Sequence, residues 1–431
     1  MLAHLEFLAG DALNGRGSGT RDEWLAAAYV ASHMRRWGLE PLGDAGGYVQ
    51  TVEMEHREAA AAPVLAFPGG RVEHGGGMVV VALSSGSAAG PLQKLATNET
   101  VKPGAVALLP PGARTSGIPG TQSAALLLVP ETPQVRAAWA TLSGRLPATR
   151  PVFTTVEDAS PQRPTTLILA RDAYDAIAAL PAESAISFQA QLKPPQKTHT
   201  WNAVGQLRGA DASAARDVIL LSAHLDHLGA RAPAGEAAAG GDGVYNGADD
   251  DASGTVAVLE LAGALADGPR PNRTIVFALF GSEEAGGAGS RFFADRPPAP
   301  LPQVIANLQF EMIGRPDKAV PPHTLWLTGY ERSTLGPELA RQGAKLVQDP
   351  HPEQNFFERS DNIQFARRGI VAHTVSSYGL HEEYHRPSDE VRLIDLAHMT
   401  DAIRSMLAPI QWLANSTFKP EWLPGKKPES R

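Results

Sequence analysis

Acidic and imidazole side chains directly follow several apolar runs of this 431-residue sequence. The run VILLSA is followed by His224 and Asp226, TIVFALFGS by Glu283 and Glu284, and VIANLQF by Glu311. Imidazole and carboxylate groups bind Zn²⁺ and other divalent ions. A carboxylate beside such an ion can also act as a general base. These residue types at successive run ends therefore predict hydrolytic metal chemistry.

Three consecutive acids, Asp249, Asp250 and Asp251, stand just before a helical stretch at 253–267. Each acid alone could cap that helix, as the adjacent glutamates could cap the next one. Many carboxylates at one edge would repel each other strongly unless cations balanced them. More carboxylates than one ion needs indicate two ions that share a bridging Asp and hold a water between them.

The pentad HEEYH at 381–385 matches the H-E-x-x-H pattern, in which two His on one helical face bind zinc. Gly379 and Pro387 flank the pentad and leave room for less than two helical turns. A helix this short is marginal. We interpret the match as accidental, which leaves one of the two His as a candidate ligand.

Apolar runs alternate with helical stretches from about residue 197 onward. Strand-like runs lie at 217–225, 273–284, 303–314, 323–330 and 370–377, and helical stretches at 253–267, 286–295, 332–344 and 393–415. This alternation predicts an α/β fold, with a mainly parallel sheet between helices on both faces. Ligands of such sheets bind beyond the carboxyl ends of the strands, where the acids and imidazoles fall.

Residues 61–196 have a different pattern. Short β-prone runs such as GMVVVAL, AALLLVP and AISFQAQL are punctuated by Pro and Gly, and the stretch ends in the Pro-rich LKPPQK. We predict a mostly β inserted domain at 61–196 and a main domain formed by 1–60 and 197–431. The first 60 residues look helical around the Gly-rich break NGRGSGT.

Composition excludes several classes of function. Lys and Arg number 38 against 46 Asp and Glu, giving a formal charge of -8 that disfavours nucleic acid and anionic membranes. No apolar run approaches the roughly 20 residues of a membrane span. The absence of cysteine excludes disulfides, zinc ribbons and thiol nucleophiles. Neither a G-x-S-x-G nor a P-loop pattern occurs.

The segments AHLDHLG, NGADDDASG, FGSEEAGGAGS, FEMIG and YHRPSD, in this order, resemble the M28 family of co-catalytic zinc peptidases, which are mostly aminopeptidases. The resemblance spans about 197–415 and implies the zinc-exopeptidase type of α/β fold. The opening LEFLAGDALNGRGSGTRDE also resembles the usual start of these proteins. The β insert is similar in placement and composition to a protease-associated domain.

The resemblance implies two Zn²⁺ per chain. The implied ligands of one ion are His224, Asp250 and Glu311, and those of the other are Asp250, Glu284 and His385. Asp250 would bridge the ions, with Asp249 and Asp251 as neighbours and a cis peptide bond after Asp250. His385 would bind from a loop, because Pro387 fixes a turn there, whereas His381 and both Glu residues of the pentad would not bind.

Three further roles follow from the resemblance. Glu283 matches the general base, and Asp226 matches a carboxylate that orients His224. Tyr384 matches a phenol that stabilises the oxyanion in some members. Two departures stand out: Glu311 replaces the Asp of many members, and Asn362 follows Ser-Asp where a His is common. We assign Asn362 no role.

The leading function is therefore an aminopeptidase acting on peptide substrates. A carboxypeptidase for acidic C-terminal residues is an alternative that needs an Arg cluster near the site; the candidates are Arg315, Arg332, Arg359 and Arg386. A non-catalytic receptor of the same fold is a second alternative, and a one-metal glutaminyl cyclase is disfavoured. The sequence leaves the preferred N-terminal side chain and the oligomeric state open.

The start of the sequence lacks the basic and then apolar pattern of a signal peptide. Members that the sequence resembles are commonly exported. We therefore expect a periplasmic or secreted protein whose leader is not in this sequence, with a cytoplasmic protein as the alternative.

Overall fold

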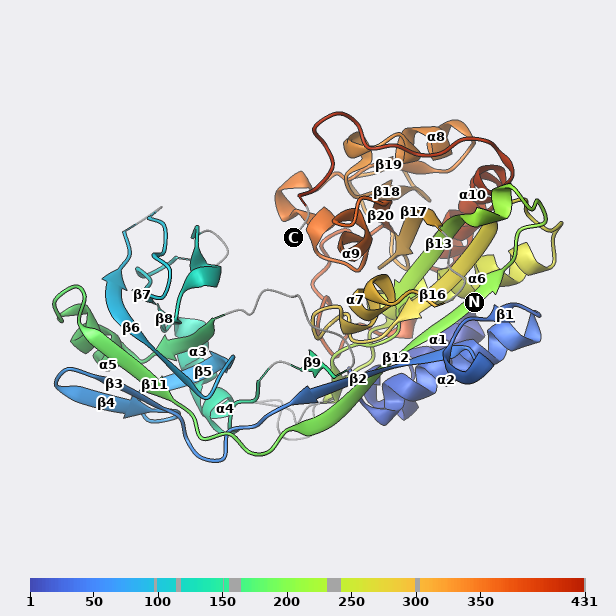
Figure 1. The fold of residues 1–431 in the computed structure, drawn as a ribbon. Coiled ribbons are helices and arrows are strands. Elements are labelled where there is room, and N and C mark those ends of the chain that lie inside the picture. The colour runs from blue at the N-terminus through green and yellow to red at the C-terminus, as the bar shows by residue number, and fades with distance from the viewer. Residues whose placement is uncertain are drawn as a thin grey trace. The chain divides into compact units, whose positions relative to one another are not determined.

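The computed structural model describes residues 1–96, 99–113, 118–149, 151–154, 164–230, 242–298 and 303–429. The chain divides into two compact units, Met1–Val52 with His199–Arg431 and Glu53–Thr198 (Figure 1). Each unit has a hydrophobic core of its own. Within the described ranges, no helix combines the length and the apolar character needed to cross a membrane.

The larger unit is built on a mixed sheet. Its strands, in spatial order, are β19 (Leu346–Gln348), β18 (Leu325–Leu327), β20 (Val371–Ser376), β17 (Gln303–Phe310), β13 (Asp217–His224), β16 (Thr274–Phe280), β12 (Gln196–Leu207) and β2 (Val49–His56), and β1 (Glu40–Pro41) pairs with β12. The central strands β16, β13, β17 and β20 are parallel. β12 and β18 join them in antiparallel orientation. The predicted α/β class with a mainly parallel sheet is confirmed.

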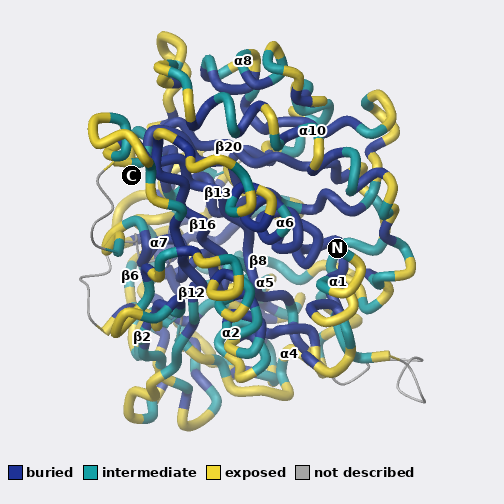
Figure 2. Tube along the Cα trace, turned by 90° about the vertical axis from the view of Figure 1, so that its right-hand side faces the viewer, coloured by how far each residue is buried: buried dark blue, intermediate teal, exposed yellow. Residues whose placement is uncertain are grey.

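Helices cover both faces of this sheet. One face packs against α1 (Leu2–Leu8), α2 (Arg21–Arg36), α6 (Gly254–Ala266), α8 (Leu335–Arg341) and α10 (Leu396–Asn415), and the other against α7 (Ala288–Asp295) and α9 (Asn362–Ala366). Along β13, Ile219 and Leu221 belong to the first core, whereas Val218 and Leu220 belong to the second. Successive side chains of a strand point to opposite faces, so the whole of β13 is buried (Figure 2). This explains the apolar run at 218–221 in its middle.

Residues 40–56 correct one expectation. The first 60 residues looked helical, and α1 and α2 are helices, but this stretch forms β1 and β2. Along β2, Gln50, Val52 and Met54 are buried while Thr51 between them is exposed. The period of two is that of a strand with one buried face. A polar residue among the inward positions hid this period from the sequence analysis.

The smaller unit is mostly β, as predicted. Its sheet has the order β4 (Gly70–Glu73), β3 (Val64–Phe67), β11 (Ala185–Gln189), β6 (Ser87–Lys94), β7 (Val106–Leu108), β8 (Leu126–Pro130), β10 (Thr165–Leu169) and β5 (Met78–Ala82). The remaining described elements between Glu53 and Thr198 include the short strand β9 (Val152–Phe153) and the helices α3 (Pro133–Ala137), α4 (Trp139–Ser143) and α5 (Arg171–Ala178). Its kinship with protease-associated domains stays a prediction.

Candidate metal centre and active site

The carboxylate of Asp250 lies between two imidazoles. His224 ends β13, and its Nε2 atom is 3.3 Å from Asp250 Oδ1. His385, in the loop after β20, has its Nε2 atom 3.1 Å from Asp250 Oδ2 and 3.2 Å from Oε1 of Glu284. Glu284 follows β16. Side chains from separate segments of the larger unit thus meet around one carboxylate, with one imidazole at each of its oxygens.

Glu311 directly follows β17 on the His224 side of this group. Burial raises its pKa to about 7, and the charges of His224 and Asp250 act on it in opposite directions. Among the described residues, buried side-chain atoms of four residues at the site lack a hydrogen-bond partner: His224 Nε2, both ring nitrogens of His227, Glu284 Oε1 and Glu311 Oε2. Buried polar atoms are rarely left unpaired. Nitrogen and oxygen donors in this state fit zinc.

The charges crowded at this site shift the pKa values of its side chains. Burial lowers the pKa of His385, but the nearby carboxylates of Asp250 and Glu284 outweigh this and raise it to about 9. Burial raises the pKa of Asp250, yet the imidazoles around it hold that pKa well below its usual value. The pKa of Glu283 is raised well above its usual value by desolvation and by the charges of neighbouring carboxylates such as Glu311. The site therefore holds more negative charge than its imidazoles neutralise.

The carboxylate of Asp251 accepts hydrogen bonds from backbone N–H groups around the site. Its Oδ1 atom accepts hydrogen bonds of 3.0 Å from the N–H groups of Gly254 and Met312, and its Oδ2 atom accepts one of 3.2 Å from the N–H of His224. Gly254 allows this approach, since a Cβ there would lie 2.3 Å from the main-chain oxygen of Phe310. The peptide bond between Asp250 and Asp251 is cis, as the resemblance implied.

Asp249 ties the same turn to the loop after β20. Its Oδ2 atom is 2.9 Å from Nε2 of His381. Asp389, further along that loop, accepts hydrogen bonds from the N–H groups of Asp249 and Asp250 at 3.0 to 3.1 Å. His381 thus contacts the acid next to Asp250, whereas His385 reaches Asp250 itself. The contact of His381 with Asp249 and the hydrogen bonds to Asp389 therefore hold the loop in place on both sides of His385.

Asp226 organises the loop after β16. Its Oδ1 atom accepts a hydrogen bond of 2.9 Å from the N–H of Glu283, and its Oδ2 atom accepts one of 3.2 Å from the N–H of Glu284. Ser18 donates a further hydrogen bond to Oδ2. His224 Nδ1 is 3.0 Å from the main-chain oxygen of Asp226 and 3.7 Å from its Oδ1 atom. The main-chain oxygen is therefore the closer partner of the imidazole, and the carboxylate chiefly positions the two glutamates.

Tyr384 packs flat on the ring of His385, with centroids 3.9 Å apart and planes 22° apart. Burial raises the pKa of its phenol, and the charges of Asp250 and Glu284 raise it further. The phenol is therefore neutral at ordinary pH and can donate a hydrogen bond. Arg359 Nη2 lies 3.5 Å from its hydroxyl.

A small cavity opens beside the metal-ligand candidates. Its volume is about 30 Å³. The lining includes Glu311 and Tyr384 together with the aromatic rings of Trp326, Phe356 and Tyr378. Arg359 also lines it, with its guanidinium 4.9 Å from the centroid of the Phe356 ring. The cavity thus combines aromatic rings and the hydroxyl residues Thr328, Ser360, Thr374 and Ser376 with one carboxylate and one cation.

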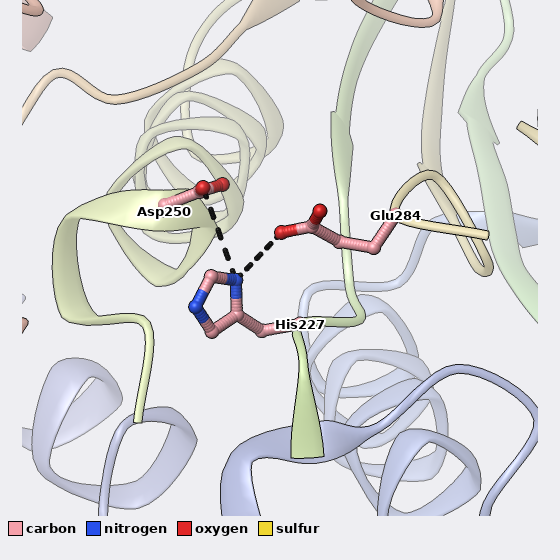
Figure 3. Close-up of side chains that lie close together, drawn as sticks. All are labelled: His227, Asp250 and Glu284. Atoms are coloured by element: carbon pink, nitrogen blue, oxygen red, sulfur yellow. Dashed lines mark ion pairs between the residues drawn. The ribbon is translucent and has the colours of Figure 1, made fainter. Parts of the chain in front are cut away.

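The sequence analysis assigned no role to two side chains that are buried at the site. His227 lies three residues after His224 and contacts Glu284 (Figure 3); its place in the same HLDH segment was the available signal. Arg16 donates hydrogen bonds to the main-chain oxygens of Leu8, Leu225, Asn246 and Gly247. Its partners are carbonyl groups, so the sequence carried no signal for it beyond the Gly-rich break.

Comparison with known proteins agrees with this geometry. The model of peptidase family M28 matches residues 202–409. The leupeptin-inactivating enzyme 1 of Streptomyces exfoliatus is 29% identical over 119 residues, which span 27% of this chain and 23% of that relative.

Two solved structures share the fold. One is an aminopeptidase from Aneurinibacillus sp. strain AM-1, with 17% identity, a TM-score of 0.60 and coverage of 99% of this chain and 95% of that chain. The other is BSAP, a zinc aminopeptidase from Bacillus subtilis, with 16% identity, a TM-score of 0.54 and coverage of 96% and 94%. The resemblance stated from the sequence is confirmed: residues 202–409 match peptidase family M28.

Proposed function

We propose that this protein is a two-zinc aminopeptidase that removes N-terminal residues from peptides. The observation that carries the proposal is the Asp250 carboxylate, which faces His224 with one oxygen and His385 with the other. One carboxylate between two imidazoles fits a bridge between two ions. Glu311 on the first side and Glu284 on the second complete the proposed ligand sets.

Two zinc ions, when bound at these ligands, supply an acidified water and polarise the substrate carbonyl. Glu283 accepts the proton of the attacking water and delivers it to the leaving amine. Its raised pKa suits the first of these steps, because a stronger base takes the proton of the water more readily. Asp226 holds the main chain of Glu283 in place through the hydrogen bond to its N–H.

Tyr384 stabilises the tetrahedral oxyanion by donating its phenolic hydrogen. The raised pKa of the phenol keeps that hydrogen in place. The stacking of its ring on His385 fixes it next to the proposed ligand. Donors fixed in advance toward a developing oxyanion are worth about 10²- to 10³-fold in rate.

The surplus of carboxylate favours a substrate with a free ammonium group. The cavity lined by Trp326, Phe356 and Tyr378 is the proposed receptor of the N-terminal side chain. A carboxypeptidase would need a cluster of free arginines here. Of the four candidates, Arg359 alone lines the cavity. Arg315 is paired with Glu383 at 2.7 Å, Arg332 lies over the ring of Phe357, and Arg386 is not part of the lining. One arginine at the cavity supports the aminopeptidase better.

A substrate panel tests the proposal. Amino-acid anilides with a free amine, their N-blocked analogues and dipeptides with acidic C-termini are assayed with and without a chelator. We expect turnover of the free-amine anilides alone, its loss with the chelator and its return with zinc. Turnover confined to acidic C-terminal substrates would support the carboxypeptidase. No turnover by protein shown to contain zinc would support the receptor.

A further inference from the structure

His227 lies at the proposed metal centre without an assigned role. Its Nδ1 atom is 2.8 Å from Glu284 Oε1 and 3.9 Å from Asp250 Oδ2. In Figure 3 the dashed lines to Asp250 and Glu284 start at the same ring nitrogen of His227, which faces both carboxylates. The residue is 1% exposed. A polar group at this depth needs a partner, because leaving it unpaired costs free energy.

Hydrogen bonding does not account for this imidazole. In the part of the chain that the structure describes, neither of its ring nitrogens makes a hydrogen bond of acceptable geometry. The Oε1 atom of Glu284, 2.8 Å from Nδ1, also lacks a well-aligned hydrogen bond. A proton shared between these two atoms would leave Asp250 out, whereas a cation would also engage Asp250. One ligand atom each from His227, Asp250 and Glu284 lies within 4.8 Å of the other two.

The distances fit a single ion. Four donor atoms gather on one side of the bridge: His227 Nδ1, His385 Nε2, Glu284 Oε1 and Asp250 Oδ2. Neighbouring pairs are 2.8, 3.1, 3.2 and 3.9 Å apart. Ligands of a tetrahedral zinc, bonded at about 2.0 to 2.1 Å, lie roughly 3.3 Å from one another. The two imidazole rings reach this point from different directions, with planes 69° apart.

We propose that His227 is a fourth protein ligand of the ion held by Asp250, Glu284 and His385. The inference rests on the proposed two-zinc site. It gives the two ions different numbers of protein ligands. The His227 side offers four protein ligands, whereas the His224 side offers His224, Glu311 and the other oxygen of Asp250. Zinc sites with four protein ligands are typically structural, and catalytic ones keep an open position. The His227 centre therefore binds its ion more tightly, and the His224 centre is the open one.

Metal titration of the full-length protein tests this without any substrate. The metal-free protein is titrated with Zn²⁺ against a chromophoric chelator and with Co²⁺ by absorption. The variants are His227→Ala, His227→Gln and, as a surface control, His323→Ala, whose side chain is 40% exposed. Gln keeps an N–H donor for Glu284 but offers no imidazole. Circular dichroism confirms that each variant is folded.

We expect two binding steps for the wild type and for His323→Ala. Loss of an outer-shell partner costs about 10- to 100-fold in metal affinity. Both His227 variants should weaken the first step by more than about 100-fold and change the Co²⁺ spectrum of the first equivalent. Wild-type affinity and spectrum in His227→Gln would overturn the proposal, because a hydrogen bond to Glu284 would then suffice.

A measurement on the wild type covers variants that fail to fold. X-ray absorption of protein loaded with one equivalent of Zn²⁺ counts its imidazole ligands, and we expect two, from His227 and His385. One imidazole would overturn the inference while leaving the aminopeptidase proposal intact. Two imidazoles without peptidase activity would uphold the metal site and contradict the proposed function.

Discussion

The Oδ1 atom of Asp226 lies 2.9 Å from the main-chain nitrogen of Glu283 and accepts its hydrogen bond, while Oδ2 accepts from the next N–H. An Asn at this position keeps the shape but replaces one acceptor oxygen with a donor. We expect Asp226→Asn to lower zinc affinity and kcat by about 10- to 100-fold each. The exposed Asp267→Asn is the control. Zinc titration and steady-state kinetics give the answer, and unchanged values in both would contradict the positioning role.

Glu283→Gln should remove the proton acceptor while keeping the size of the side chain. General bases contribute about 10²- to 10⁴-fold, so kcat should fall within that range. Zinc content, measured by emission spectroscopy, should stay at the wild-type value because Glu283 is not a proposed ligand. Glu382→Gln, in the exposed part of the loop after β20, is the matched control. Wild-type turnover in Glu283→Gln would remove this residue as the base.

Tyr384→Phe should keep the stacking on His385 and lose the hydroxyl. We expect kcat to fall by about 10²- to 10³-fold with little change in KM, since the donor acts on the oxyanion. Tyr330→Phe, in the turn before α8, is the control. A rise in KM at constant kcat would instead assign Tyr384 to substrate binding.

Zinc affinity should rise with pH. In the metal-free protein the pKa of His385 is raised to about 9, so at neutral pH zinc must displace its proton. The apparent association constant of the ion at His385 should climb about tenfold per pH unit up to about pH 9, and that of the ion at Glu311 should climb in the same way up to about pH 7, where Glu311 loses its proton. Titrations from pH 6 to 10 check the slope. A flat profile would contradict the protonated resting state.

The same pKa shift of His385 makes the stability of the protein without zinc depend on pH. The pKa of His385 is raised above its ordinary value of 6.5. Protonated His385 therefore stabilises the fold below about pH 6.5, and this contribution is lost as the pH rises through about 9. Thermal unfolding with and without zinc should show opposite pH trends over this interval.

The sheet could be predicted from the alternation of apolar and helical runs. Three of the five proposed ligands stand at strand ends: His224 is the last residue of β13, and Glu284 and Glu311 follow β16 and β17 within four residues. Parallel strands bring their carboxyl ends to one edge, so position in the sequence implied position in space. The strand β2 was missed because its inward positions include the polar Gln50.

Longer-range relations had no such signal. Arg16 binds main-chain carbonyl groups, which every residue carries, so its partners leave no trace in the sequence. His381 was predicted not to bind metal, but its contact with Asp249 depends on how two loops fold together. The hydrogen bonds that the Asp226 carboxylate accepts from the N–H groups of a neighbouring loop had no signal in the sequence either.

The main-chain carbonyl groups that bind Arg16 also determine when this part of the protein can fold during synthesis. Two of its carbonyl partners, Asn246 and Gly247, are 230 and 231 residues downstream. During synthesis the first segment leaves the ribosome long before these partners exist, and His385 emerges later still. A nascent or prematurely terminated chain therefore lacks a complete hydrolytic centre. Other polypeptides in the cell are not exposed to it until translation of this unit is almost finished.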